Sequence, residues 1–208
     1  MDTKAVIKSE ELETKFLILD KAVSLFAEKG FNGASMRDLA VACSITPGAL
    51  YYYFPNKKSL HEAAIIYAYR DRARPAVDSL EESGMGPMEI LEKFVLRLSE
   101  RFYHDHEFRR IVQWTILDSD SDEGIRNIII DVVYETHFDS LTKFLQPLNL
   151  SIDAYRLTTF IFGMVMHNYF TLEQRKNHHG YKPNKEKPKQ ITKEVMQLLN
   201  CGIFAYKQ

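Results

Sequence analysis

One short stretch of the chain gathers hydroxyl and small side chains in a pattern suited to molecular recognition. Gly48 and Ala49 are followed by a leucine and then by three consecutive tyrosines, Tyr51, Tyr52 and Tyr53. Three adjacent tyrosines on a short helix are hard to bury together, so at least one should be exposed. A helix that reads base edges needs small and hydrogen-bonding groups on its exposed side. The stretch has such groups, and its function depends on the elements around it.

The residues before this stretch predict two short helices joined by a tight turn. Ser35, with Asp38 three residues later, has the pattern of an N-cap that satisfies free backbone N–H groups. Thr46 is suited to cap the next helix, and Pro47 fits its first position, where a missing N–H does no harm. The turn falls at Ser44. Two helices so joined form a helix-turn-helix candidate, whose last helix enters the major groove.

Apolar spacing predicts the helices that hold this motif. The first helix has its apolar positions at steps of three and four: Leu12, Phe16, Leu19, Val23 and Phe26. Gly30 is suited to end that helix, because glycine adopts positive φ at little cost. Asn56 can cap a fourth helix that begins at Lys57. In the short helix between, Leu50 and Phe54 are expected to face the core, which leaves Thr46, Gly48, Ala49, Tyr52 and Tyr53 facing outward.

Residues 26–60 resemble the DNA-binding domain of the TetR family, most specifically in the run LYYYF followed by NKK. The resemblance implies phosphate contacts from Ser35, Arg37, Tyr52 and Lys57. It implies base-edge or groove-floor contacts from Pro47, Gly48, Ala49 and Tyr51 or Tyr53. One departure is Ser44, where the family often has glycine. Because serine tolerates a left-handed conformation less well, a slightly altered turn is expected.

Each of these assignments has a structural alternative. A tyrosine on a helix is usually half-buried packing. Arg37 could pair with Asp38 or with a carboxylate of the first helix instead of a phosphate. Lys58 is expected to be simply solvated.

Helical spacing continues through the remainder of the chain, with about nine helices in all and no convincing strand. We therefore expect an all-α protein. Residues 10–70 would form the helix-turn-helix domain with its three helices, and residues 71–208 a larger helical domain for effector binding and dimerisation.

The second domain carries no motif of comparable specificity, so its sites follow from the family resemblance. Pocket candidates are aromatic, soft or polar-tipped residues on helices expected to converge: Phe94, Phe102, Trp114, Tyr134, His137, Phe138, Met164 and His167. Residues 159–166 are apolar all round, which predicts cover by another chain as well as their own. Dimer candidates are Phe160, Gly163, Val195, Leu199, Gly202 and Ile203. Most such aromatics belong to cores, and the two histidines are not expected to bind metal.

Composition narrows the function classes. The formal charge of −1 argues against indiscriminate coating of nucleic acid. Cys43 and Cys201 suit free thiols in a reducing cytoplasm, and no signal peptide is visible. The longest uncharged run, residues 157–172, predicts a buried helix rather than a membrane span. We expect no catalytic site, metal or cofactor, since the acidic residues 118–122 lack the glycine and closing glutamate of a calcium loop.

The sequence thus predicts a ligand-responsive regulator, a repressor by family habit, that binds a pseudo-palindromic operator as a homodimer. A small, lipophilic or aromatic effector would release the DNA, with coupling through the fourth helix. Two alternatives remain: a regulator of the same fold without a small-molecule effector, and a helical enzyme or carrier with a vestigial DNA-binding domain.

Overall fold

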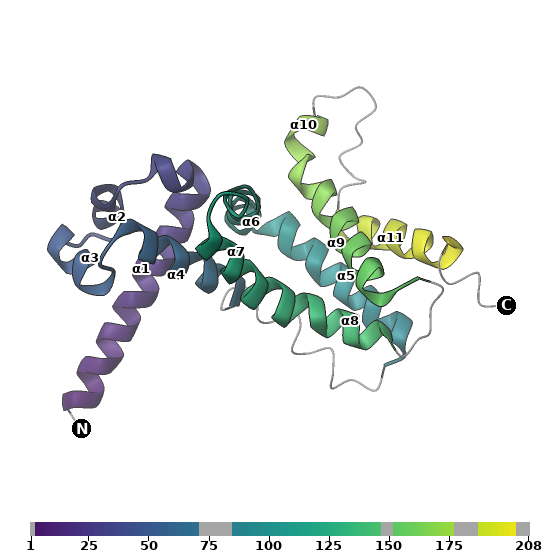
Figure 1. The fold of residues 1–208 in the computed structure, drawn as a ribbon, viewed down its shortest axis with the longest axis horizontal. Helices are drawn as coiled ribbons and strands as arrows, with labels where there is room; N and C mark the ends of the chain where they lie inside the picture. Colours follow the sequence, from purple (N-terminus) through teal and green to yellow (C-terminus); the bar gives the residue numbers. More distant parts are fainter. Residues whose placement is uncertain (1–2, 71–84, 147–151, 177–186, 203–208) are drawn as a thin grey trace. The chain divides into compact units, whose positions relative to one another are not determined.

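The computed structural model describes residues 3–70, 85–146, 152–176 and 187–202 (Figure 1). Within these ranges every regular element is a helix, which confirms the predicted all-α class. The elements are α1 (Thr3–Gly33), α2 (Met36–Ala42), α3 (Pro47–Tyr53), α4 (Lys57–Arg70), α5 (Pro87–His104), α6 (His106–Asp118), α7 (Glu123–Ile129), the π-helix η2 (Ile130–Phe138), α8 (Asp139–Leu145), α9 (Ala154–Phe170), α10 (Leu172–Lys176) and α11 (Pro188–Gly202). None of them has an apolar stretch long enough to cross a membrane.

The described ranges contain more helices than predicted because two long predicted helices are divided. The hydrogen-bond register changes to that of a π-helix over Ile130–Phe138, which separates α7 from α8. Another break lies at Thr171, which caps α9 with φ −99° and ψ 10° and precedes α10. Apolar spacing continues across both breaks, so the sequence pattern alone predicts one helix in each place.

The chain divides into two compact units. The first unit consists of Met1–Arg72 and Arg110–Ile129, and the second of Ala73–Arg109 and Ile130–Gln208. The first division lies close to the boundary expected at residue 70. However, the second domain was expected to be continuous from residue 71, whereas Arg110–Ile129 packs with the first unit. Those contacts join residues far apart in sequence, which no local pattern marks.

The first unit is built on α1. This helix packs against α4 and α2, while α2 packs against α3 and α4 against α7. The unit's core consists of fully buried apolar side chains, among them Ile18, Val23, Phe26, Leu39, Leu50 and Leu60. Burial of each such side chain stabilises the fold by roughly 1.5–3 kcal/mol. The core thus fixes α3 to the rest of the unit.

The second unit packs α5 against α11 and α9, and α8 against α9 and η2. Its interior is rich in aromatic contacts. Phe162 lies with its ring centroid 5.7 Å from that of Phe94 and 5.7 Å from that of Phe138. Phe102 contacts Phe108 and Phe170 at 5.6 and 5.7 Å. Aromatic packing therefore fills much of this unit, beside side-chain to backbone hydrogen bonds such as those of Arg109 and Asp153.

Candidate nucleic-acid interface

Side-chain caps fix the backbone of the helix-turn-helix. The Ser35 hydroxyl accepts a hydrogen bond from the Asp38 N–H (3.1 Å), and the Asp38 carboxylate accepts one from the Ser35 N–H (3.2 Å). The bond to Ser35 is the main reason that the pKa of Asp38 is lowered. The Thr46 hydroxyl accepts from the Ala49 N–H at 3.1 Å. Both predicted N-caps are confirmed, so α2 and α3 start at fixed residues.

The turn between α2 and α3 has a left-handed residue. Ser44 has φ 56° and is the non-glycine residue with positive φ in the described ranges. The Ser44 N–H donates to the carbonyl of Val41 and the Ile45 N–H to that of Ala40, both at 3.0 Å. The expected strain at Ser44 is therefore present, at roughly 1–2 kcal/mol for a residue with a Cβ. The turn remains tight, with its hydrogen bonds intact.

Helix α3 has a buried and an exposed side. Leu50 and Phe54 are buried, as predicted. Tyr52 is the most exposed of the three tyrosines, at 74%, and Tyr51 is 50% exposed, whereas Tyr53 is half-buried. Thr46, Pro47 and Gly48 are exposed, and Ala49 is half-buried. Small groups and phenolic hydroxyls therefore share one accessible face.

Lys57 is held inside the first unit. Its ammonium donates to the carbonyls of Phe31 (2.9 Å) and Ala34 (3.0 Å) and lies 4.3 Å from the centroid of the Phe31 ring. An ammonium has three N–H donors, so these two bonds leave one donor for a phosphate. Lys57 thus holds the bend between α1 and α2, a role that the sequence prediction missed.

Arg37 and Tyr52 differ in how they are held. Arg37 is exposed and has no ion pair with any described residue. The Tyr52 hydroxyl donates to the carboxylate of Glu11 on α1 at 3.3 Å, and the negative charge of Glu11 raises the pKa of Tyr52. Sequence reasoning missed Glu11, because its partner lies far along the chain.

Lys58 is not simply solvated, contrary to the prediction. Its ammonium contacts the carboxylate of Asp122 at 2.9 Å. This hydrogen-bonded pair raises the pKa of Lys58 and lowers that of Asp122. Asp122 also accepts from the N–H of Ile125, as an N-cap of α7 would. An acidic residue before a short apolar helix is the sequence pattern of an N-cap, so Asp122 could have been predicted as the cap of α7. Its ion pair with Lys58 also links α7 to α4.

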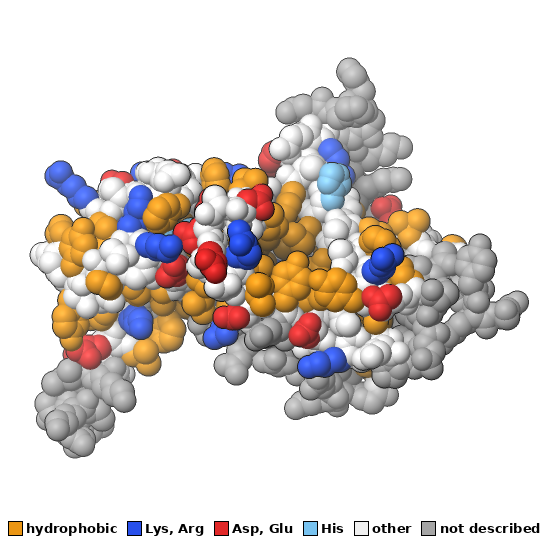
Figure 2. Space-filling model, in the orientation of Figure 1, with side chains coloured by type: hydrophobic (Ala, Val, Ile, Leu, Met, Phe, Trp, Pro, Cys, Tyr) orange, Lys and Arg blue, Asp and Glu red, His pale blue; other side chains and the backbone are white. Residues whose placement is uncertain are grey.

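Charge is mixed over the first unit. On the face shown in Figure 2, Lys and Arg side chains alternate with Asp and Glu instead of gathering by sign. This distribution agrees with the near-neutral formal charge of −1. Contacts with DNA would therefore depend on a few placed groups.

The pocket candidates are divided between the two units. Phe94, Phe102 and Phe138 are buried in the second unit, where Tyr134 contacts Phe138 with ring centroids 5.0 Å apart. The side chain of His137 lies outside the described residues. Trp114 belongs to the first unit, where its indole N–H donates to the carbonyl of Ala27 at 3.4 Å. The remaining candidates, Met164 and His167, line a surface hollow.

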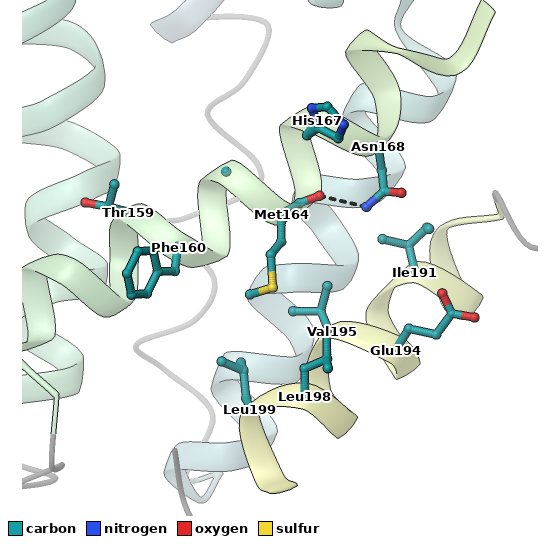
Figure 3. A pocket seen from close by; sticks show the side chains of 11 residues that line it. Thr159, Phe160, Met164, His167, Asn168, Ile191, Glu194, Val195, Leu198 and Leu199 are labelled. Carbon is teal, nitrogen blue, oxygen red and sulfur yellow. Dashed lines mark hydrogen bonds between the residues drawn. The ribbon is translucent and has the colours of Figure 1, made fainter. Parts of the chain in front are cut away.

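That hollow lies between α9 and α11 and has a volume of about 790 Å³ (Figure 3). We call it the α9–α11 hollow. It is lined by Thr159, Phe160, Gly163, Met164, His167, Asn168, Ile191, Glu194, Val195, Leu198 and Leu199. Phe160 is 53% and Leu198 64% exposed. Most of these residues are apolar, and Phe160 and Leu198 are the large hydrophobic side chains among the exposed ones.

The dimer candidates differ in how exposed they are. Gly163 faces open space, since a Cβ added there would meet no atom within 4 Å. Val195 and Leu199 are buried within the single chain. Gly202 is the last residue of α11, and Ile203 lies outside the described residues. Leu198, which the prediction omitted, is the exposed neighbour of Leu199.

Comparison with known proteins identifies the class of the first unit. Residues 18–64 match the family described as "Bacterial regulatory proteins, tetR family". The chain is 32% identical over 96 residues to the HTH-type transcriptional regulator YuxN of Bacillus subtilis, which covers 46% of this chain and 33% of YuxN. It is 30% identical over 95 residues to the biofilm operon negative regulator IcaR of Staphylococcus aureus, which covers 41% of this chain and 47% of IcaR. The chain thus spans less than half the length of these relatives.

Solved structures extend the likeness in fold over most of the chain. FadR of Bacillus subtilis in complex with stearoyl-CoA has a TM-score of 0.72 at 17% identity, covering 90% of this chain and 98% of FadR. AibR in complex with isovaleryl coenzyme A and operator DNA has a TM-score of 0.67 at 21% identity, covering 89% of this chain and 97% of AibR. Residues 18–64 thus match the TetR family of bacterial regulators, which confirms the resemblance found in residues 26–60.

Proposed function

We propose that the chain is a DNA-binding transcriptional repressor that binds a pseudo-palindromic operator as a homodimer in the cytoplasm. The observation that carries the proposal is the exposed face of α3. Thr46, Pro47 and Gly48 are accessible there beside Tyr51 and Tyr52, while caps at both helix starts keep the backbone rigid. A rigid helix with small and hydroxyl-bearing residues can enter the major groove.

The proposed contacts divide by chemistry. Pro47, Gly48, Ala49 and Tyr51 or Tyr53 would approach the base edges, since they lie at the start and along the open side of α3. Phosphates would be bound by Ser35, Arg37 and Tyr52, which are exposed, and by the third N–H of Lys57. Arg37 is the strongest of these candidates, because no described carboxylate pairs with it.

The α9–α11 hollow supports the homodimer. Phe160 and Leu198 expose large apolar surfaces at its edge, and Gly163 leaves room for a close helix. A second copy on this face would form a bundle of four helices, two from each chain. Such an interface is self-complementary, as a two-fold dimer on a two-fold operator requires.

We further propose that the effector has a mostly apolar body with a neutral or anionic head, as acyl thioesters do. The aromatic interior of the second unit suits an apolar body. Among the described residues of this unit the buried charged side chain is Arg109, whose guanidinium donates to the carbonyl of Phe102. A buried cation disfavours a cationic ligand. Among solved structures of like fold, FadR and AibR are complexes with stearoyl-CoA and isovaleryl coenzyme A, whereas a regulator from Saccharomonospora viridis is a complex with choline, so both ligand classes are tested.

The test begins with selection of duplexes from randomised DNA by the full-length protein. We expect one pseudo-palindromic duplex family, whose binding is then followed by fluorescence anisotropy. Long- and short-chain acyl-CoA should release the duplex, whereas choline, a cationic probe, should not. By linkage, the duplex must weaken acyl-CoA binding by the same factor in isothermal titration. Selective DNA binding without release by any probe would support the regulator without a small-molecule effector. Failure to enrich any duplex would remove the DNA-binding function.

A further inference from the structure

The bend at the end of α1 is contacted by side chains from outside the helix-turn-helix. Gly30, inside the span of α1, has φ 68° and ψ 177°, so the helix is interrupted there. The carbonyl of Ala27, one turn before the bend, accepts hydrogen bonds from the Arg110 Nε–H and the Trp114 Nε1–H, both at 3.4 Å. Both donors lie on α6, and all four residues belong to the first unit. Two side chains therefore converge on one backbone atom.

The Trp114 ring also fills the space beside Gly30. A Cβ added at position 30 would lie 3.3 Å from the Cε2 and Cζ2 atoms of the ring, which is tighter than ordinary contact. The positive φ separately favours glycine. The Arg110 guanidinium lies 5.2 Å from the Trp114 ring and donates to the side chain of Gln113 at 3.3 Å. The donors are thus positioned by each other as well as by their helix.

This bend sets the direction in which the helix-turn-helix leaves α1. Lys57 holds the carbonyls of Phe31 and Ala34 from the side of α4, and Ser35, the N-cap of α2, follows at once. Beyond Ser35, caps and turn bonds leave little freedom between α2 and α3. A change at the bend would therefore move α3 as a body instead of being absorbed in the turn.

We propose that Arg110 and Trp114 are positioning residues for operator binding, acting through the Ala27 carbonyl. The proposal rests on the DNA-binding function proposed for α3, because the two donors fix the bend from which the helix-turn-helix leaves α1.

The experiment measures operator affinity for variants of the full chain, with a duplex selected by the wild type. The double variant Trp114→Phe/Arg110→Gln keeps a ring beside Gly30 but loses both donors to Ala27. Gly30→Ala places a Cβ against the ring. Leu117→Ala is the matched control, since Leu117 lies on α6 and is exposed. Anisotropy titrations at several salt concentrations give Kd and the salt slope, and circular dichroism melts show that each variant is folded.

We expect Kd to rise about tenfold in the double variant, which loses two ordinary hydrogen bonds to Ala27. In Gly30→Ala we expect a rise of about the same size, because the added Cβ displaces the Trp114 ring and strains the backbone at positive φ. The salt slope should not change, because no phosphate contact is removed. Leu117→Ala should match the wild type. Should the double variant not fold, Trp114→Phe and Arg110→Gln separately give the same comparison.

Two results would overturn the positioning role while leaving the DNA-binding function intact. One is wild-type affinity in folded test variants. The other is a lower salt slope, which would mark Arg110 as a phosphate ligand. A wild-type protein that selects no duplex would instead remove the DNA-binding function, and this role with it.

Discussion

The candidate DNA-binding and effector or dimer regions of the two units are held by different kinds of contact. In the first unit, polar side chains bond to backbone atoms, as when Ser35 and Thr46 cap helices and Lys57 holds two carbonyls. In the second unit the interior depends on aromatic rings such as Phe102 and Phe162. Its α9–α11 hollow leaves large apolar side chains exposed.

This difference matches two physical tasks. Hydrogen bonds from side chain to backbone are directional, so they fix where a helix starts and how it is aimed. Apolar contacts are non-directional and depend on area, so an aromatic interior and an apolar face can accept a ligand or a second chain of matching shape. The contacts of the first unit therefore keep the helix-turn-helix in one geometry, whereas the aromatic interior and apolar face of the second unit are suited to contact a ligand or a second chain.

The largest expected effect comes from charging the exposed apolar face of the second unit. Phe160→Glu or Leu198→Glu would place an unpaired charge in the proposed interface, weakening dimerisation by roughly 3–5 kcal/mol. Sedimentation velocity should then show folded monomers, and operator affinity should be lost. Leu199 is unsuitable for this test because it is buried within the single chain, with 1% of its surface exposed, so a charge there would disrupt the fold itself. Lys193→Glu, exposed on α11 but outside the hollow lining, is the control. Intact dimers of both test variants would remove the proposed interface.

The first unit should lose stability on mild acidification, through His61. This side chain is buried between Phe26 and Phe31, and burial lowers its pKa to about 4, with Lys57 adding to the shift and Asp122 opposing it. Since the unfolded chain takes up the proton near pH 6.5, stability falls as pH drops from about 6.5 to about 4, by about 3 kcal/mol. Urea unfolding at several pH values measures this slope. His61→Gln should flatten it in that window, and an unchanged slope would contradict the assignment.

Variants of Arg37 and Lys57 should distinguish a residue that mainly contacts DNA from one that also stabilises the fold. Lys57→Ala leaves two carbonyls without their donor and should lower the free energy of unfolding by roughly 1–3 kcal/mol. Arg37→Ala should leave unfolding unchanged but reduce the salt slope of operator binding by about one unit. Urea unfolding and salt-dependent anisotropy on both variants make the comparison. Loss of stability in Arg37→Ala, or none in Lys57→Ala, would reverse the two roles.

The smallest expected effect is at the turn. Ser44→Gly should raise the free energy of unfolding by about 0.5–1 kcal/mol, since glycine adopts φ 56° without strain but is more flexible when unfolded. Thermal melts would show the gain. Ser44→Ala, which keeps a Cβ, should show none. A glycine variant with a lower free energy of unfolding would mean that the Ser44 side chain stabilises the fold by more than the backbone strain destabilises it.

The sequence predicted the first unit well where the physics is local. The caps at Ser35, Thr46 and Asn56, the first position of Pro47 and the left-handed Ser44 all depend on neighbours within a few residues. Such signals survive in a single sequence.

Contacts between distant residues could not be predicted in this way. The contacts of Trp114 with Ala27 and Gly30, which lie in another helix, have no local sequence signal. The partners of Lys57 and Lys58 were missed for the same reason. Apolar spacing located the helices of the second unit, yet it could not distinguish core from exposed edge at Leu198 and Leu199. Spacing gives the face of a helix but not what covers it.

The proposed function requires that α3 of each chain in a dimer reads one of two successive major grooves. Hydroxyl-radical footprinting of the selected duplex, repeated with duplexes selected by Ala49→Leu, measures this arrangement. We predict two protected half-sites with centres about 10–10.5 base pairs apart, or a multiple of that spacing. The bulkier residue at position 49 should change base preference equally in both half-sites. A single protected site, or base preferences unchanged by Ala49→Leu, would show that α3 does not bind DNA in this way.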